Sequence, residues 1–191
     1  MREKVIMDDK VNNYAKEKYV ANATTRTKDL VFTALLIALV FIATKFINFQ
    51  LPFSLHGGLI HLGNTILFAA AIVFGPKKGA ISGAFGMGLF DLVSGWVVWA
   101  PFTFVIRGLM GWMIGTIANR KGRNGDSFKW NIIAILLGSI WMISGYYISE
   151  VIIYGNWFTP LTAVPGDITQ VIIGIILGIP LITALKKTKI V

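Results

Sequence analysis

The pentapeptide Gly75-Pro76-Lys77-Lys78-Gly79 interrupts an apolar stretch and separates two hydrophobic runs, residues 60–75 and 79–98. Proline and glycine end helices, and the two lysines favour a turn that stays in water. Two apolar helices joined by so short a turn must run antiparallel. The sequence therefore predicts a helical hairpin that crosses a membrane, with its turn at the membrane surface.

The same apolar pattern extends along most of the chain. Of its 191 residues, 55% are hydrophobic and 14% are charged, which is too apolar for an ordinary water-soluble domain. We expect an all-α integral membrane protein, a compact six-transmembrane-helix bundle over residues 29–191 that follows a basic cytoplasmic tail over residues 1–28. The predicted spans approach or reach the roughly 20 residues that cross a bilayer, and they cover residues 30–49, 60–75, 79–98, 102–118, 130–154 and 167–185.

Basic residues outside these spans occur in one alternate set of connections. Lysine and arginine lie in the N-terminal tail, the turn at Lys77 and Lys78, residues 119–129 and the C-terminus, whereas the other three loops have neither. The positive-inside rule therefore predicts that both termini are cytoplasmic. The net charge of +9 is spread over loops, where basic residues set the orientation in the membrane and contact anionic lipid head groups. We therefore expect no nucleic-acid partner.

Pairs of glycines four residues apart occur in three predicted helices. Such pairs leave a smooth groove in which another helix backbone can approach closely, and they are Gly79 with Gly83, Gly111 with Gly115, and Gly174 with Gly178. Together they indicate a closely packed bundle.

Polar side chains within the predicted spans gather at one depth, about 10 Å or less from the outer surface. An intramembrane charge costs about 2.5 to 3.5 kcal/mol, so it needs a partner, water or a function. The charges could pair with one another to fix the helices, or reach the interface. Contributions from five helices to one layer, beneath two long outer loops (50–59 and 155–166), favour a small-molecule pocket. The predicted substrate-binding residues are Lys45, His61, Asn64, Asp91, Trp96, Arg107, Tyr147, Glu150, Asp167 and Gln170.

The composition of this layer limits the ligand. Two basic residues against three carboxylates disfavour a strongly anionic molecule, and a neutral or cationic one fits better. Trp96, Trp99 and Trp157 lie near the same depth, where tryptophan commonly anchors a protein at the interface but can also hold a flat heteroaromatic ring.

Several classes of activity are disfavoured by missing residues. The turn at Gly75 lacks the spacing and the Gly-Lys-Ser/Thr ending of a phosphate-binding loop, so the chain alone cannot hydrolyse ATP. Ser82 lies at the opposite end of its span from His56 and His61, which leaves it without a base. Two histidines do not complete a metal site, and the chain has no cysteine. We therefore expect no enzyme, no cofactor and no metal ion.

Several segments together resemble the substrate-binding S components of energy-coupling factor (ECF) vitamin transporters. They are Phe74-Gly75-Pro76-Lys77-Lys78-Gly79-Ala80-Ile81-Ser82-Gly83-Ala84-Phe85-Gly86, Phe90-Asp91-Leu92, Trp99-Ala100-Pro101-Phe102-Thr103 and Ile106-Arg107-Gly108-Leu109-Met110-Gly111. The similarity is greatest to the riboflavin-type group, which includes hydroxymethylpyrimidine and pyridoxine candidates. Ala34 and Ala38 resemble the alanine pair with which S components dock on a coupling subunit.

The resemblance implies a multi-pass protein of the bacterial plasma membrane that captures a vitamin on its outer side. It implies a lid after the first helix, and as partners a transmembrane coupling subunit and two cytosolic ATPases. The favoured ligand is a neutral heteroaromatic vitamin or precursor, hydroxymethylpyrimidine or pyridoxine before riboflavin. A self-sufficient secondary transporter and a structural membrane subunit remain alternatives.

Overall fold

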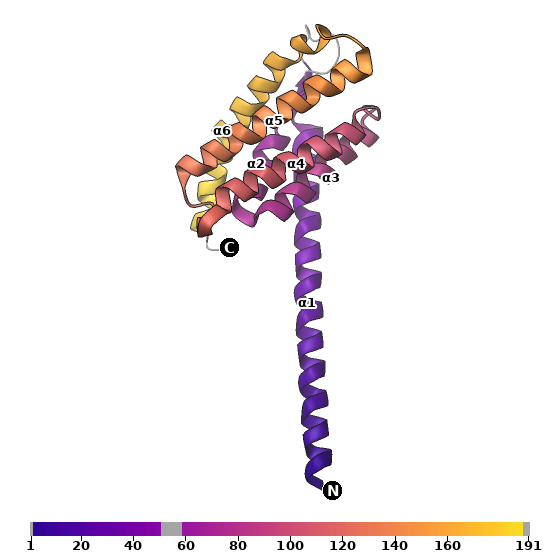
Figure 1. The fold of residues 1–191 in the computed structure, drawn as a ribbon, viewed down its shortest axis with the longest axis vertical. Coiled ribbons are helices and arrows are strands. Elements are labelled where there is room, and N and C mark those ends of the chain that lie inside the picture. Colours follow the sequence, from indigo (N-terminus) through magenta and orange to yellow (C-terminus); the bar gives the residue numbers. More distant parts are fainter. Residues whose placement is uncertain (1, 51–58, 189–191) are drawn as a thin grey trace. The chain divides into compact units, whose positions relative to one another are not determined.

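The computed structural model describes residues 2–50 and 59–188, and within them the chain forms six α-helices (Figure 1). They are α1 (Arg2–Phe46), α2 (Gly63–Phe74), α3 (Pro76–Val93), α4 (Ala100–Asn119), α5 (Phe128–Tyr154) and α6 (Val164–Lys187), with two short 3₁₀ turns, η1 (Arg120–Gly122) and η2 (Thr159–Thr162). The predicted tail, residues 1–28, is helical from Arg2 onward, because no glycine or proline occurs before residue 52.

The chain divides into two units, Met1–Leu35 and Leu36–Val191. The second unit contains α2 to α6 and the last part of α1, and it is the unit that holds the pockets described below.

Among the described residues, four helical segments are long and apolar enough to cross a membrane: Ala23–Phe46, Ala100–Gly122, Phe128–Tyr154 and Thr159–Lys187. The expected all-α membrane fold is therefore supported, but two of the six expected spans do not meet these criteria. Helix α3 has 18 residues but contains Lys77, Lys78 and Asp91. Helix α2 has only 12 residues, about 18 Å, and it is surrounded by other helices rather than by lipid.

A two-stranded antiparallel hairpin, which the sequence analysis did not predict, explains why α2 is short. Strand β1 (Asn48–Gln50) pairs with β2 (Leu59–His61), with Phe49 opposite Ile60. Residues 60–62 were expected to be helical, yet the first two pair with β1, and His61 Nδ1 accepts a hydrogen bond from the Gly63 amide at the start of α2 (3.1 Å). The expected lid lies mostly in residues 51–58, outside the described residues.

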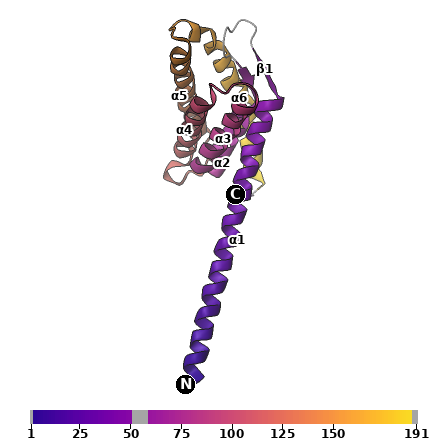
Figure 2. The same ribbon diagram turned by 90° about the vertical axis from the view of Figure 1, so that its right-hand side faces the viewer.

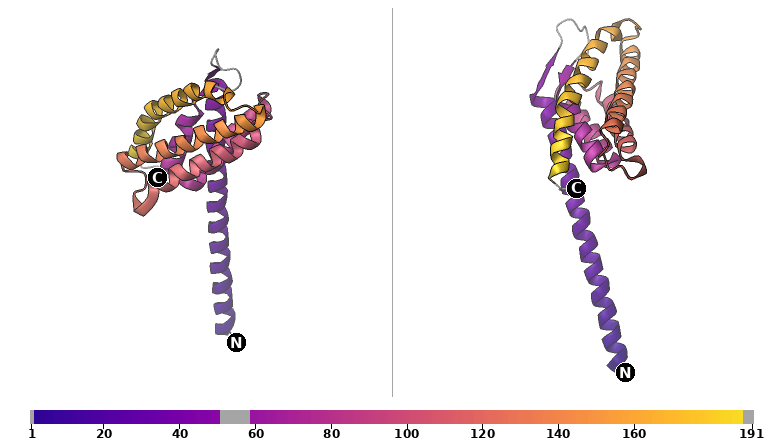
Figure 3. Two further views of the ribbon diagram at one scale, coloured as in Figure 1. Left: turned by 45° about the horizontal axis from the view of Figure 1, so that its top comes forward. Right: turned by 90° about the vertical axis from the view of Figure 1, so that its left-hand side faces the viewer.

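Helix α2 is at the centre of the bundle (Figure 2). It packs against α3, α4 and α6, while α3 packs on α4 and α4 on α5. Strand β2 lies against α6 at one end of the unit (Figure 3). Phe68, Leu67 and Met110 are fully buried in the apolar core, which leaves the polar residues of these helices to gather at its end.

Glycines allow α3 and α4 to pack backbone to backbone. A Cβ atom added to Gly111 would overlap the Gly79 carbonyl group, and one added to Gly83 would lie 2.9 Å from the Arg107 carbonyl oxygen. These contacts confirm the predicted packing role of the glycine pairs in both helices. They also set the position of Arg107 relative to α3.

Three of the basic connections meet at one end of the second unit. Asn119 Nδ2 donates to the Ile72 carbonyl oxygen (3.2 Å), which joins the end of α4 to the α2–α3 turn. Lys186 pairs with Asp126 (2.9 Å), which joins the loop before α5 to the end of α6. The spatial arrangement therefore agrees with the grouping that the charge pattern predicted.

Candidate binding site

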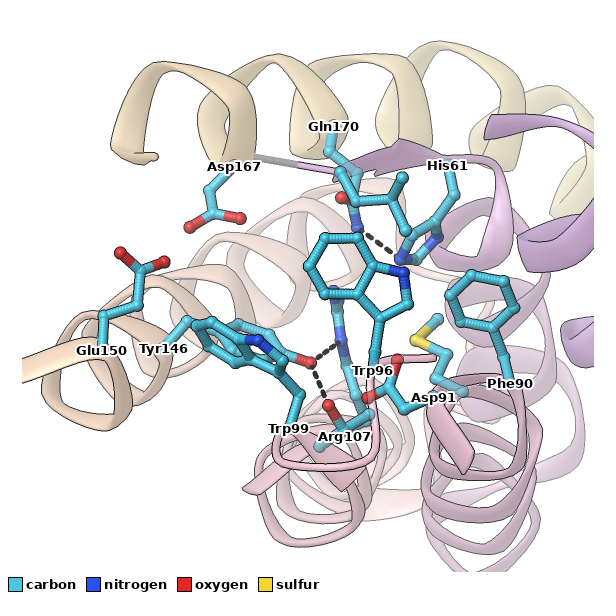
Figure 4. Close-up of a pocket in the computed structure, with 13 residues that line it drawn as sticks. His61, Phe90, Asp91, Trp96, Trp99, Arg107, Tyr146, Glu150, Asp167 and Gln170 are labelled. Carbon is cyan, nitrogen blue, oxygen red and sulfur yellow. Dashed lines mark hydrogen bonds between the residues drawn. The ribbon is translucent and has the colours of Figure 1, made fainter. Parts of the chain in front are cut away.

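A pocket lies at the opposite end of these helices from the basic connections. The space between its walls, part of which is open to solvent, is about 540 Å³. Figure 4 shows its polar and aromatic walls. The lining residues come from β2, from α3 and the turn after it, and from α4, α5 and α6: Leu59, His61, Met87, Phe90, Asp91, Trp96, Trp99, Thr103, Arg107, Tyr146, Glu150, Asp167 and Gln170.

The guanidinium group of Arg107 is the polar centre of this end of the bundle. Arg107 is 3% exposed, and its Nε donates to the Tyr146 hydroxyl (3.0 Å). Its Nη1 donates to Asn64 Oδ1 (2.6 Å) and contacts Met142 Sδ (2.7 Å). The Tyr146 hydroxyl also shares a hydrogen bond with Thr103 (3.1 Å). Arg107 thus links α4 to α2 and α5.

Gln170 connects the same network to α6 and β2. The Gln170 side-chain amide is oriented so that its nitrogen donates to the Leu59 carbonyl oxygen (2.8 Å). In this orientation the amide oxygen accepts hydrogen bonds from Asn64 Nδ2 and from Arg107 Nη2 (3.1 Å each). This oxygen also lies 3.5 Å from His61 Nε2. Because His61 Nδ1 accepts from Gly63, a neutral His61 carries its proton on Nε2 and can donate to Gln170.

Burial and the nearby Arg107 guanidinium lower the pKa of His61 well below its usual value of 6.5. The ring is therefore neutral near pH 7, and it acts as one more neutral hydrogen-bonding group in the network.

Arg107 attracts Asp91 and Asp167 through its charge but does not touch the carboxylates of the pocket. No ion pair joins Arg107 to Asp91, Glu150 or Asp167 in the described part of the chain. Glu150 is 3% exposed, and its Oε2 atom has no hydrogen-bond partner among those residues. The Glu150 and Asp167 side chains point toward one another at one side of the pocket (Figure 4). Neither carboxyl group makes a side-chain hydrogen bond to a described residue.

Aromatic rings form the wall between the acidic side and Asp91. Trp99 is buried against Tyr146, with ring centroids 6.3 Å apart, and against Tyr154 at 6.2 Å. The Trp96 ring lies across the pocket near Asp91 (Figure 4). A flat ligand ring could therefore contact indole faces while its edge meets the carboxylates.

Most of the residues predicted from the sequence lie together. Seven line the pocket: His61, Asp91, Trp96, Arg107, Glu150, Asp167 and Gln170. Asn64 is fully buried just behind them and orients Arg107.

Two of the predicted binding residues, Lys45 and Tyr147, do not line the pocket. Lys45 Nζ donates to Ser94 Oγ (2.9 Å) beside the Phe90 ring, at the exposed end of α1. Tyr147 follows Tyr146, so it points about 100° around α5 and donates to the Trp157 carbonyl oxygen (2.7 Å).

Several lining or supporting residues were not among the predicted binding residues, and four of them contact the Arg107 network or the aromatic wall. Tyr146 and Trp99 were assigned from the sequence to the same layer as the predicted binding residues, but the layer does not tell which side of a helix faces the pocket. Thr103 has no charge, and Met142 is apolar, so neither stands out in a membrane helix. Their role becomes visible only through their contacts with Tyr146 and Arg107.

Residues 24–187 match the family model described as "ECF-type riboflavin transporter, S component". The chain belongs to this family. It is therefore a substrate-binding subunit of a vitamin or vitamin-precursor transporter, and not an enzyme. The resemblance noted in the sequence is confirmed.

This S component is also similar to individual proteins. It is 29% identical over 163 residues to the thiamine precursor transporter HmpT of Lactococcus lactis subsp. cremoris (strain MG1363), covering 85% of this chain and 90% of that protein. It is 32% identical over 141 residues to a Pyrococcus woesei protein described as "Uncharacterized protein in gap 3'region", covering 72% and 89%.

A solved structure shares the fold. The chain reported under "Structure and mechanism of the S component of a bacterial ECF transporter" matches with a TM-score of 0.65 and 24% identity, over 85% of this chain and 98% of that chain. The S-component fold therefore covers most of the molecule.

The Gln170 network predicts a specific loss of stability. Gln170→Leu removes the oxygen that accepts from Asn64 and Arg107 and leaves these buried donors unpaired. We expect the variant to lose about 1 to 3 kcal/mol of stability, seen as a lower unfolding midpoint of the detergent-solubilised protein. Thr169→Ala, at the neighbouring exposed position, is the control. An unchanged midpoint for Gln170→Leu would contradict the network.

Proposed function

We propose that this S component captures a neutral, amino- or hydroxyl-bearing heteroaromatic vitamin precursor, of the hydroxymethylpyrimidine type, from the outer side of the membrane. The observation that carries the proposal is the buried Glu150 carboxylate, whose Oε2 lacks a partner in the described residues and faces an aromatic-lined pocket. A buried carboxylate without donors is costly, and a ligand that supplies N–H or O–H groups removes that cost.

The arrangement of the pocket supports this ligand class. Trp96 and Trp99 offer ring faces, while Glu150 and Asp167 offer acceptors at one side. An aminopyrimidine with a hydroxymethyl group presents a flat ring and donors on its edge. Pyridoxine presents hydroxyl donors, whereas the riboflavin ring edge carries mainly acceptors. The Lactococcus lactis relative is named as a thiamine precursor transporter, which points to the same ligand class.

Most N–H donors of the Arg107 guanidinium already bind acceptors of the protein. Nε–H and both Nη1–H groups meet Tyr146, Asn64 and Met142, and Nη2 donates to Gln170. One Nη2–H is left for a ligand. With three carboxylates nearby, a ligand that carries two negative charges would be poorly compensated.

A self-contained energy source is absent from the sequence, so we propose that transport depends on a transmembrane coupling subunit and two cytosolic ATPases. Ala34 and Ala38 lie one turn apart in α1, and both are exposed. A small-residue face of this kind suits close contact with a partner helix. We place the protein in the bacterial plasma membrane with both termini inside, in agreement with the distribution of its basic residues.

Ligand titration tests the substrate class. We expect hydroxymethylpyrimidine to bind the purified protein and Glu150→Gln to weaken binding about tenfold or more, because the variant offers one acceptor fewer and no charge. Pyridoxal phosphate should not compete. Asp126→Asn makes the same chemical change at the far end of α5 and is the control. Equal affinity of Glu150→Gln and the unchanged protein, or tight binding of pyridoxal phosphate, would contradict the proposal.

Assembly tests the coupling surface separately. We expect Ala34→Trp combined with Ala38→Trp to abolish co-purification with the coupling subunit and uptake into cells, while ligand affinity of the isolated protein stays nearly unchanged. The reason is that two indole rings would hold a partner helix away, and neither alanine is among the residues that line the pocket. Normal assembly and uptake by the double variant would show that docking occurs elsewhere.

A further inference from the structure

A second pocket lies at the other end of α5 and α6. The first pocket uses Tyr146 and Glu150 of α5, whereas the second uses Phe128 and Asn131, about four helical turns or more earlier. It has about 590 Å³ of empty space. Its lining residues are Gly125, Asp126, Phe128, Asn131, Ile179, Ile182, Thr183, Lys186 and Lys187.

One end of this pocket is basic. Lys186 Nζ donates to the Asn124 carbonyl oxygen and pairs with Asp126 (2.9 Å), so its charge is largely balanced and it holds the loop against α6. Lys187, in contrast, makes no hydrogen bond or ion pair within residues 2–50 and 59–188. The pocket therefore carries one lysine that no carboxylate of the described residues pairs with.

A buried acceptor also lines the pocket. Asn131 is 5% exposed, and its Nδ2 donates to the Gly125 carbonyl oxygen (2.8 Å). Its Oδ1 is buried and has no partner in the described part of the chain. A buried carbonyl oxygen of this kind needs a donor, so the pocket is prepared for a ligand that has a hydroxyl or N–H group as well as a negative charge.

The remaining wall is apolar. Ile179 and Ile182 belong to α6, and Phe128 at the start of α5 is 67% exposed. An apolar wall that leads to a lysine and a buried acceptor matches the order of groups in a phospholipid: acyl chain, phosphate, polar headgroup. Basic pockets between membrane helices on the cytoplasmic side are known to suit anionic headgroups.

We propose that this pocket binds one anionic phospholipid whose headgroup carries hydroxyl groups, of the phosphatidylglycerol type. The phosphate lies near Lys187, a headgroup hydroxyl donates to Asn131 Oδ1, and an acyl chain follows Ile179 and Ile182. The bound lipid would hold the α5–α6 end of the bundle at the inner membrane surface. This inference rests on the positive-inside orientation and is independent of the transported substrate.

Native mass spectrometry of the full chain from detergent micelles doped with defined lipids tests the site. We expect one phosphatidylglycerol to be retained, with a preference of about fivefold or more over phosphatidylcholine. Phosphatidic acid, which has no headgroup hydroxyls, should bind more weakly than phosphatidylglycerol. Lys187→Gln should remove the preference for phosphatidylglycerol over phosphatidylcholine. Lys77→Gln, which changes another exposed lysine at the same end, should leave it intact.

Three results would overturn the proposal. The first is equal retention of phosphatidylglycerol and phosphatidylcholine by the unchanged protein, a comparison that needs no variant to fold. The second is an undiminished preference in Lys187→Gln. The third is displacement of the lipid by millimolar inorganic phosphate, which would assign the pocket to free phosphate, or by the coupling subunit, which would assign it to a protein partner.

Discussion

The hydrogen bonds of Arg107 are the constraint on which the arrangement of the pocket depends. A guanidinium group buried among membrane helices must have its donors satisfied, because no water is available to do so. Here Asn64, Tyr146 and Gln170 supply oxygen atoms from three other helices, and Met142 supplies sulfur. The network therefore fixes α2, α4, α5 and α6 at one depth, and through Leu59 and His61 it also fixes β2.

This network determines which charged groups of the pocket are bound by protein groups and which are left for a ligand. Because neutral acceptors satisfy most of the Arg107 donors, none of the three pocket carboxylates forms a direct ion pair within the described residues. Glu150 is the clearest case, since it is buried and its Oε2 has no partner there. The site is therefore built to receive donors and ring faces, and not to neutralise an anion, which is why we connect it with a neutral precursor.

The sequence predicted the helices and the depth of the polar layer, but not the contacts within it. Hydrophobic length and the Gly75–Gly79 turn are local properties, so α3 to α6 were found without a structure. Lys45 and Tyr147 were predicted from their position in the same layer, yet their side chains do not line the pocket, because the direction of a side chain around a helix depends on its neighbours. The β1–β2 hairpin was missed because three-residue strands have no periodicity and arise from pairing across residues 51–58.

The molecule that stays bound during purification tests the central claim most directly. The protein would be expressed in rich medium, purified in detergent and denatured, and the released small molecules identified by mass spectrometry against an equal amount of Glu150→Gln protein. The account predicts a neutral heteroaromatic compound with amino or hydroxyl donors, released in near-stoichiometric amount from the unchanged protein and strongly reduced in the variant. Release of a phosphorylated or non-aromatic compound, or equal amounts from both proteins, would contradict it.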